Sequence, residues 1–222
     1  MTIQAVLWDL DGVLVDTGDQ HYLAWARTLE RYQIPFSRDL FRETFGMNNW
    51  SILTRLLGRQ PDRELYENIS NNKEESFRLG IRGQVKPLPG VLETLQTLNA
   101  RGIRQAIASS APPENIDALV DELGLRDRFQ AIVSAYKLPG KPAPDVFLAA
   151  AKAIDVPPLQ CLVIEDAVTG VAGAKRAGML CLAVTNTNPA EALHQADYVV
   201  ASLLPLKAVF WDALLGLSEG NS

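Results

Sequence analysis

The stretch QAVLWDLDGVLVDT, residues Gln4–Thr17, joins an apolar run to two closely spaced carboxylates. Its first part, Ala5–Trp8, predicts a buried core strand. Asp9 and Asp11 follow that strand directly, with Gly12 beside them. Clustered carboxylates repel one another and raise one another's pKa unless a cation lies among them. The strand end therefore indicates either residues that cap a turn or helix, or a site for a cation.

The composition is that of an ordinary globular protein. The 222 residues are 47% hydrophobic and 21% charged, with a net charge of −5, which suits one domain or a domain with an insert. The negative balance and the lack of a Lys/Arg block argue against nucleic acid as a partner. Nothing at the N-terminus resembles a signal peptide, and no apolar run approaches the ~20 residues that cross a bilayer. We therefore expect a soluble, cytoplasmic protein with no membrane association. The sequence does not fix the oligomeric state, for which a monomer is our expectation.

The cysteine and histidine content argues against a zinc site. There are two residues of each type, and none has the spacing of metal ligands. Cys161 and Cys181 both lie inside apolar runs. The sequence therefore predicts two reduced thiols in the core.

Most of the chain alternates short apolar runs with helical patterns. This alternation predicts an α/β fold, with a doubly wound, Rossmann-like parallel sheet and helices on both faces. Besides the first strand, the expected strands span 103–108, 129–133, 160–165, 180–184 and 197–200, and the expected helices span 90–101, 113–123, 144–154 and 168–177.

Residues 17–83 break this rhythm. Their apolar residues follow helical spacing, and 62–79 reads as a polar helix. Trp50 is expected in the core of this region. The sequence thus predicts an all-helical domain, 17–83, inserted into a core formed by 1–16 and 84–222.

Chemically active side chains follow four of the expected strands. Ligands of open parallel sheets bind beyond the C-terminal strand ends, so these side chains should meet at one edge. Each alone has a plain alternative as a helix cap or a solvated lysine. The set comprises Asp9 and Asp11, then Ser109 and Ser110, then Lys141 in GKPAP, then Glu165 and Asp166.

Taken together, these side chains predict a magnesium site that holds a phosphate. Oxygen ligands from Asp9, Asp166 and a backbone carbonyl suit Mg²⁺, which prefers carboxylate and phosphate oxygens. Lys141 and Ser109 would then donate to the remaining phosphate oxygens. The expected partner is a small phosphorylated metabolite.

Four segments resemble the motifs of the haloacid dehalogenase superfamily: DLDGVLVDT, IASS, GKPAPD and IEDAVTGVAGAKRAGM, in that order. The helical insert is similar to the first class of cap domain in that family. Within the superfamily, the chain most resembles the β-phosphoglucomutase-like branch of sugar-phosphate phosphatases and mutases.

The resemblance implies a role for each matching position. Asp9 would be the nucleophile that forms an aspartyl phosphate, and Asp11 the general acid/base, whose backbone carbonyl also binds Mg²⁺. Ser109 would bind the phosphoryl group, and Lys141 would neutralise charge between Asp9 and the phosphate. The implied metal ligands are Asp9, Asp11 and Asp166, with support from Glu165.

The resemblance also suggests substrate-binding residues. Gly12 and Ser110 would lie near the phosphate, while His21, Asn48 and Asn49 belong to the cap. In β-phosphoglucomutases a lysine and an arginine of the cap loop hold the substrate's second phosphate. FGMNNWSIL has Phe45 and Asn49 at these positions, and neither can form a charge-assisted bond to phosphate.

The departure in the cap loop favours a Mg²⁺-dependent phosphatase acting on a small phosphomonoester, a sugar or polyol phosphate. The alternative is a β-phosphoglucomutase-type phosphomutase on hexose phosphates. A receiver-type signalling domain is disfavoured because it lacks the helical insert and the second aspartate. A purely binding protein is disfavoured because no motif is lost.

Overall fold

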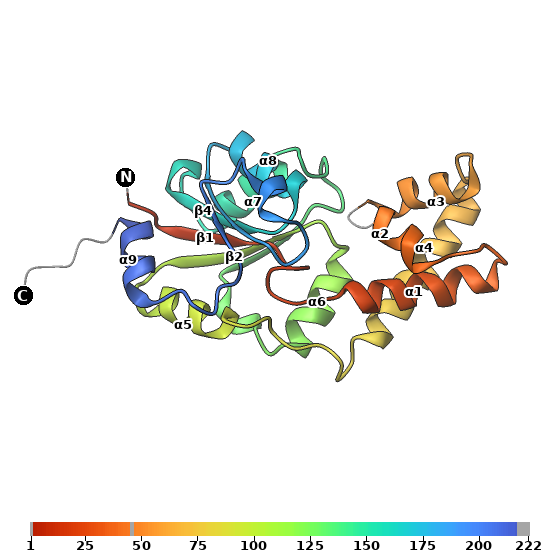
Figure 1. The fold of residues 1–222 in the computed structure, drawn as a ribbon, viewed down its shortest axis with the longest axis horizontal. Helices are drawn as coiled ribbons and strands as arrows, with labels where there is room; N and C mark the ends of the chain where they lie inside the picture. Colours follow the sequence, from red (N-terminus) through yellow and green to blue (C-terminus); the bar gives the residue numbers. More distant parts are fainter. Residues whose placement is uncertain (1, 45–46, 217–222) are drawn as a thin grey trace, which may run out of the picture. The chain divides into compact units, whose positions relative to one another are not determined.

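The computed structural model describes residues 2–44 and 47–216 (Figure 1). The chain forms two compact units. One contains the described residues of Met1–Asp16 and Lys86–Ser222, and the other those of Thr17–Val85. The first is called the core unit below and the second the helical unit.

The described residues of the core unit include a six-stranded parallel sheet in the order β3-β2-β1-β4-β5-β6. Its α/β class and its strands are as predicted, with ends that differ by one or two residues. The central position of β1 places the opening stretch between β2 and β4. The strands are β1 (Ala5–Trp8), β2 (Arg104–Ser109), β3 (Ala131–Ser134), β4 (Cys161–Glu165), β5 (Leu180–Val184) and β6 (Tyr198–Val200).

The sheet register aligns the ends of the three central strands. Trp8 is paired with Ile107 of β2 and with Ile164 of β4. The Asp9 amide, one residue on, donates to the Ile164 carbonyl over 3.0 Å. The residues that follow these strands therefore emerge at one edge of the sheet.

Helices cover both faces of the sheet. Figure 1 shows α7 and α8 over one face and α5 and α6 over the other. Because successive side chains of a strand point to opposite faces of the sheet, each strand contributes apolar side chains to the helix layers on both faces. The bounds are α5 (Val91–Ala100), α6 (Pro113–Glu122), α7 (Asp145–Ala153), α8 (Val168–Arg176) and α9 (Ala208–Leu215).

The two faces of β1 enter different cores. Leu7 packs with Phe147 of α7 and Val171 of α8 in one buried apolar cluster. On the α5 side, the indole N–H of Trp8 donates to the Gln105 side chain over 3.1 Å. The side-chain Nε2 of Gln105 in turn donates to the Leu95 carbonyl over 3.2 Å. A buried polar group of β2 is thus satisfied by the helix that covers it.

In the core unit, the state of the two cysteines was predicted from the sequence, whereas helix α9 was not. Cys161 and Cys181 are buried free thiols, as predicted, and burial raises the pKa of the Cys161 thiol to about 11. Helix α9 was not expected, because its short, almost wholly apolar sequence has no helical alternation of polar and apolar residues. It forms because Trp211 and Leu215 are buried.

The helical unit contains α1 (Gly18–Arg31), α2 (Arg38–Thr44), α3 (Asn49–Leu57) and α4 (Arg63–Gly80), and no strand occurs among its described residues. Buried apolar residues of α1, α3 and α4 form its core. The Trp50 prediction is wrong: its side chain is 37% exposed and packs edge-on against Tyr66 at 5.1 Å.

None of the helices in the described ranges of the chain is both long and apolar enough to span a membrane.

Candidate active site

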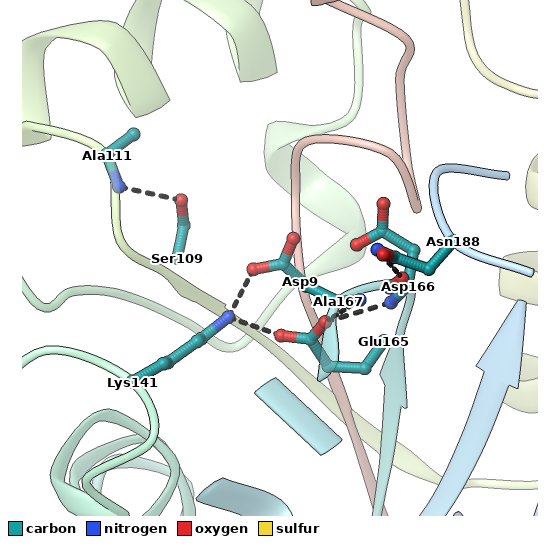
Figure 2. A network of polar contacts seen from close by, with 8 residues as sticks. All are labelled: Asp9, Ser109, Ala111, Lys141, Glu165, Asp166, Ala167 and Asn188. Atoms are coloured by element: carbon teal, nitrogen blue, oxygen red, sulfur yellow. Dashed lines mark hydrogen bonds and ion pairs between the residues drawn. The ribbon is translucent and has the colours of Figure 1, made fainter. Parts of the chain in front are cut away.

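A buried lysine joins two of the strand-end carboxylates. Lys141 Nζ donates to Asp9 Oδ1 over 2.5 Å and to Glu165 Oε1 over 2.7 Å (Figure 2). All three side chains are largely buried. Asp9 follows β1, Glu165 is the last residue of β4, and Lys141 comes from the segment between β3 and α7. The fold therefore brings together three residues that the sequence placed at one sheet edge.

The start of α8 holds Glu165 in place. Its second oxygen, Oε2, accepts from the amides of Asp166 (2.8 Å) and Ala167 (2.9 Å). A Cβ at Gly170 would lie 1.7 Å from Glu165 Oε1, so only glycine allows this carboxylate to lie against the helix. Because both of its oxygens accept hydrogen bonds, the Glu165 carboxylate is held in one orientation.

Three carboxylates lie close enough to share a cation. Asp9, Glu165 and Asp166 each offer an oxygen, and these oxygens are all within 4.8 Å of one another. Burial, reinforced by Glu165 and Asp166, raises the pKa of Asp9 well above its ordinary value, although Lys141 opposes the rise. Burial and the charge of Glu165 raise the pKa of Asp166 to about 7. One ammonium thus does not neutralise the group.

The donor set fits Mg²⁺. All the available ligands are oxygens, and the excess negative charge is buried, which is the environment that a small divalent cation stabilises. Burial alone would lower the pKa of Lys141, but the charges of Asp9 and Glu165 raise it above its ordinary value. Lys141 therefore stays cationic beside the carboxylates.

The turn after β1 brings Gly12 against Asp166. The φ of Gly12 is 83°, which an L side chain rarely adopts. A Cβ there would also lie 1.9 Å from Asp166 Oδ2. Gly12 thus lets the β1 and β4 loops approach each other. The Asp11 carboxylate is not part of the group of three, but its charge helps to raise the pKa of Asp166.

The two serines after β2 have different environments. Ser109 is buried, and its Oγ accepts from the Ala111 amide over 3.1 Å (Figure 2). Ser110 is exposed. Neither caps α6, whose N-cap residue is Pro112, with no side-chain cap. The alternative interpretation of these serines as caps of α6 is therefore wrong.

Two of the cap candidates lie in a buried polar cluster of the helical unit. Lys73 Nζ lies 3.1 Å from His21 Nδ1 and donates to Glu74 Oε1 over 2.9 Å. Asn49 Nδ2 donates to the same Glu74 oxygen over 2.8 Å, and the His21 ring stacks on Phe77 at 4.1 Å. Lys73 and Glu74 were not singled out from the sequence, where they read as part of a solvated helix.

The other two residues considered in the loop before α3 are Asn48, whose position the structure describes, and Phe45, whose position it does not. Asn48 is exposed, and its side chain accepts from the Ser51 amide over 2.9 Å as the N-cap of α3. This bond uses the side-chain oxygen for helix capping. Phe45 lies outside the described residues.

The loop after β5 was not predicted from the sequence to lie at the site. Asn186 Nδ2 donates to the Gly12 carbonyl over 2.8 Å, and Asn188 Nδ2 donates to the Asp166 carbonyl over 3.0 Å (Figure 2 shows the second bond). The expectation that ligands bind beyond strand ends applies to β5 as well. It would have directed attention to this loop, whose residues are otherwise ordinary turn formers.

Comparison with known proteins agrees with this site. A family model described as haloacid dehalogenase-like hydrolase matches residues 3–178. Beta-phosphoglucomutase of Bacillus subtilis (strain 168) is 35% identical over 207 residues, 89% of each chain. Fructose-1-phosphate phosphatase YqaB of Escherichia coli (strain K12) is 31% identical over 176 residues, 78% of this chain and 92% of that protein.

Solved structures agree as well. The crystal structure of beta-phosphoglucomutase from Clostridium difficile has a TM-score of 0.84 at 28% identity, and the match covers 96% of this chain and 97% of that one. The match extends over both units of the fold, so the similarity is not confined to the four motifs. The chain therefore belongs to the haloacid dehalogenase-like hydrolases and, within them, to the β-phosphoglucomutase-like branch.

Proposed function

We propose that the protein is a Mg²⁺-dependent phosphatase that hydrolyses a small phosphomonoester, a sugar or polyol phosphate, through an aspartyl phosphate on Asp9. The observation that carries the proposal is the Lys141 ammonium between Asp9 and Glu165, with Asp166 beside them. This arrangement retains excess negative charge in a buried place. A divalent cation and a phosphoryl group together would resolve that imbalance.

In the first step, an oxygen of Asp9 attacks phosphorus. The new O–P bond forms as the ester O–P bond breaks, and the carboxylic acid of Asp11 donates its proton to the leaving alkoxide. In the second step, the Asp11 carboxylate takes a proton from water as the water oxygen attacks phosphorus, and the bond between phosphorus and the Asp9 oxygen breaks. Inorganic phosphate leaves, and Asp9 and Asp11 return to their starting states.

Two donors of the core unit would hold the phosphoryl oxygens. Lys141 stays protonated, so its ammonium can stabilise negative charge that develops on the transferring group. Ser109 Oγ accepts from the Ala111 amide, and its hydroxyl proton could be donated to the phosphoryl group. Mg²⁺, when bound by the carboxylates of Asp9 and Asp166 and the Asp11 carbonyl, would neutralise the charge of the same oxygens.

We propose the helical unit as the cap that selects the substrate. His21, Asn48 and Asn49 remain our candidates for contact with the leaving group, and Gly12 and Ser110 for the phosphate side. Asn49 and Lys73 both bond to Glu74, so that carboxylate compensates the buried ammonium. This pairing supports a substrate with a single phosphate.

A phosphomutase acting on hexose phosphates is the second candidate. The observation that favours it is the 35% identity to a beta-phosphoglucomutase over 89% of both chains. The two activities differ only in whether water or a second sugar hydroxyl accepts the phosphoryl group from Asp9.

The deciding experiment assays the purified protein on a panel of sugar and polyol phosphates, with Mg²⁺ and with EDTA. The phosphatase proposal expects free phosphate that requires Mg²⁺ and Asp9. Isomerised hexose phosphate without free phosphate would establish the mutase instead. Full hydrolysis in EDTA, or by Asp9→Asn, would reject the proposed mechanism.

A further inference from the structure

The loop after β5 crosses from one side of the site to the other. In the sheet, β4 lies between β1 and β5, yet Asn186 reaches the Gly12 carbonyl in the turn after β1. To do so, the loop passes the end of β4, where Asp166 lies. A loop that only connected β5 to the next helical turn would need no contact with β1.

Three successive side chains of this loop contact the proposed metal site. Asn186 holds the Gly12 carbonyl (2.8 Å) and Asn188 holds the Asp166 carbonyl (3.0 Å). The Thr187 side chain lies beside the Asp166 carboxylate, and it opposes the rise in the pKa of Asp166. Its Oγ1 would also be 2.8 Å from a Cβ at Gly12, so Gly12, Asp166 and Thr187 meet at one point.

The contacts restrain Asp166 from several directions. Its amide donates to Glu165 (2.8 Å), its carbonyl accepts from Asn188, and its carboxylate lies beside the Thr187 side chain. Gly12 packs against Oδ2 of the same carboxylate. Side chains that orient a metal ligand commonly change metal affinity or activity by ~10–100-fold when removed.

We propose that Asn186, Thr187 and Asn188 are positioning residues that set the Mg²⁺ affinity of the site by holding Asp166 against the β1 turn. Their contacts are with Gly12 and Asp166, so they would act on the metal through these two residues. The proposal rests on the proposed function, because it assumes that Asp166 is a Mg²⁺ ligand. It assigns this loop a task that the motif residues alone do not perform.

The test compares Mg²⁺ binding to the substrate-free protein, measured by titration calorimetry, in wild type, Asn188→Ala and Asn186→Ala. We expect the dissociation constant to rise roughly tenfold for Asn188→Ala and by less for Asn186→Ala, which acts through Gly12. At saturating Mg²⁺, kcat and the substrate KM should return to within about threefold of wild type.

A matched pair at Thr187 separates positioning from general structural effects. Thr187→Ser keeps the hydroxyl and should bind Mg²⁺ as wild type does, whereas Thr187→Val should bind it more weakly. Asn99→Ala, an exposed residue of α5, is the control for loss of an asparagine. Melting temperatures in EDTA should stay within a few degrees for every variant, because Asn186 and Thr187 are exposed and Asn188 is half-buried.

The outcomes distinguish this inference from the proposed function. If the wild type binds Mg²⁺ and both Asn188→Ala and Thr187→Val bind it equally tightly, the positioning role is rejected and the proposed function stands. If the wild type binds no Mg²⁺ at all, both are rejected. If Asn188→Ala alone is unstable, the Thr187 pair decides.

Discussion

The two buried lysines of this protein lie in very different surroundings. Lys141 in the core unit bonds to Asp9 and Glu165, with Asp166 nearby. Lys73 in the helical unit bonds to Glu74, its neighbour in sequence. Burial would raise the pKa of Glu74, but Lys73 and the Asn49 hydrogen bond lower it below its ordinary value. Asp9 and Asp166 instead have raised pKa values.

The difference separates a compensated cluster from one that requires a ligand. A buried ammonium and carboxylate that bond to each other reduce each other's cost of burial. A group of three carboxylates around one ammonium keeps excess charge that the fold alone does not compensate. Perturbed groups of the second kind concentrate at functional sites. If the proposed function holds, the same residue type supports structure in one unit and chemistry in the other.

The largest expected effect is that of Asp9→Asn. Removal of the proposed nucleophile should lower kcat by roughly a thousandfold or more, while the fold is retained. Steady-state phosphate release and circular dichroism would measure the two effects. Asp127→Asn, at an exposed position, should leave kcat unchanged. A variant at Asp9 with more than a tenth of wild-type activity would contradict the assignment.

Next in size is the contrast between Lys141→Met and Lys73→Met. Each leaves a buried carboxylate without its ammonium and should cost about 3 kcal/mol in the free energy of unfolding. Only Lys141→Met should also lower kcat, by roughly a hundredfold or more, because its ammonium acts on the phosphoryl group. Urea unfolding and kinetics of the two variants, side by side, would measure this. Equal losses of kcat would remove the functional distinction between the two clusters.

The third expected effect is the pH dependence of the stability of the metal-free protein, and it should be smaller than the two effects above. The pKa of Asp166 is raised in the folded state from 3.8 to about 7, so the folded state binds this proton more tightly than the unfolded chain does. Its contribution to stability is full below pH 3.8 and is lost as pH rises through about 7. Wild-type melting temperature in EDTA should fall relative to that of Asp166→Asn over this window, and Mg²⁺ should reverse the fall at pH 8. A difference that is constant with pH would contradict the prediction.

The smallest effect is expected for Glu74→Gln. The lowered pKa of Glu74 in the folded state stabilises the protein above the ordinary pKa of 4.5, and this contribution is lost as pH falls through the folded value. The variant should be less stable than wild type by about 1–2 kcal/mol at pH 7, less than Lys73→Met, because the Gln amide oxygen can still accept from Lys73. The difference should shrink in acid. Glu75→Gln, exposed on the same helix, is the control in denaturant titrations. A stability difference that grew in acid would contradict a lowered pKa of Glu74 in the folded state.

The cluster around Lys141 could be predicted from the sequence, whereas the cluster around Lys73 could not. Asp9, Lys141 and Glu165 could be grouped from sequence because each follows an expected strand, and parallel strands end at one sheet edge. Lys73 and Glu74 could not, because a Lys-Glu pair in a polar helix reads as a solvated surface. Burial of that pair depends on packing between α1 and α4, which helical spacing does not reveal for charged side chains.

By itself, the sequence determined the fold class, the strands to within two residues, the all-helical character of the insert and the residues that meet at the sheet edge. These follow from local periodicity and from charged and polar residues that come directly after the expected strands. Only the tertiary structure decided that Gly170 makes room for Glu165, that the loop after β5 holds Gly12 and Asp166, and that Trp50 is exposed. Such contacts join residues far apart in the chain or depend on packing. They are determined by the order of the strands and by how closely the segments pack, which a local sequence pattern does not show.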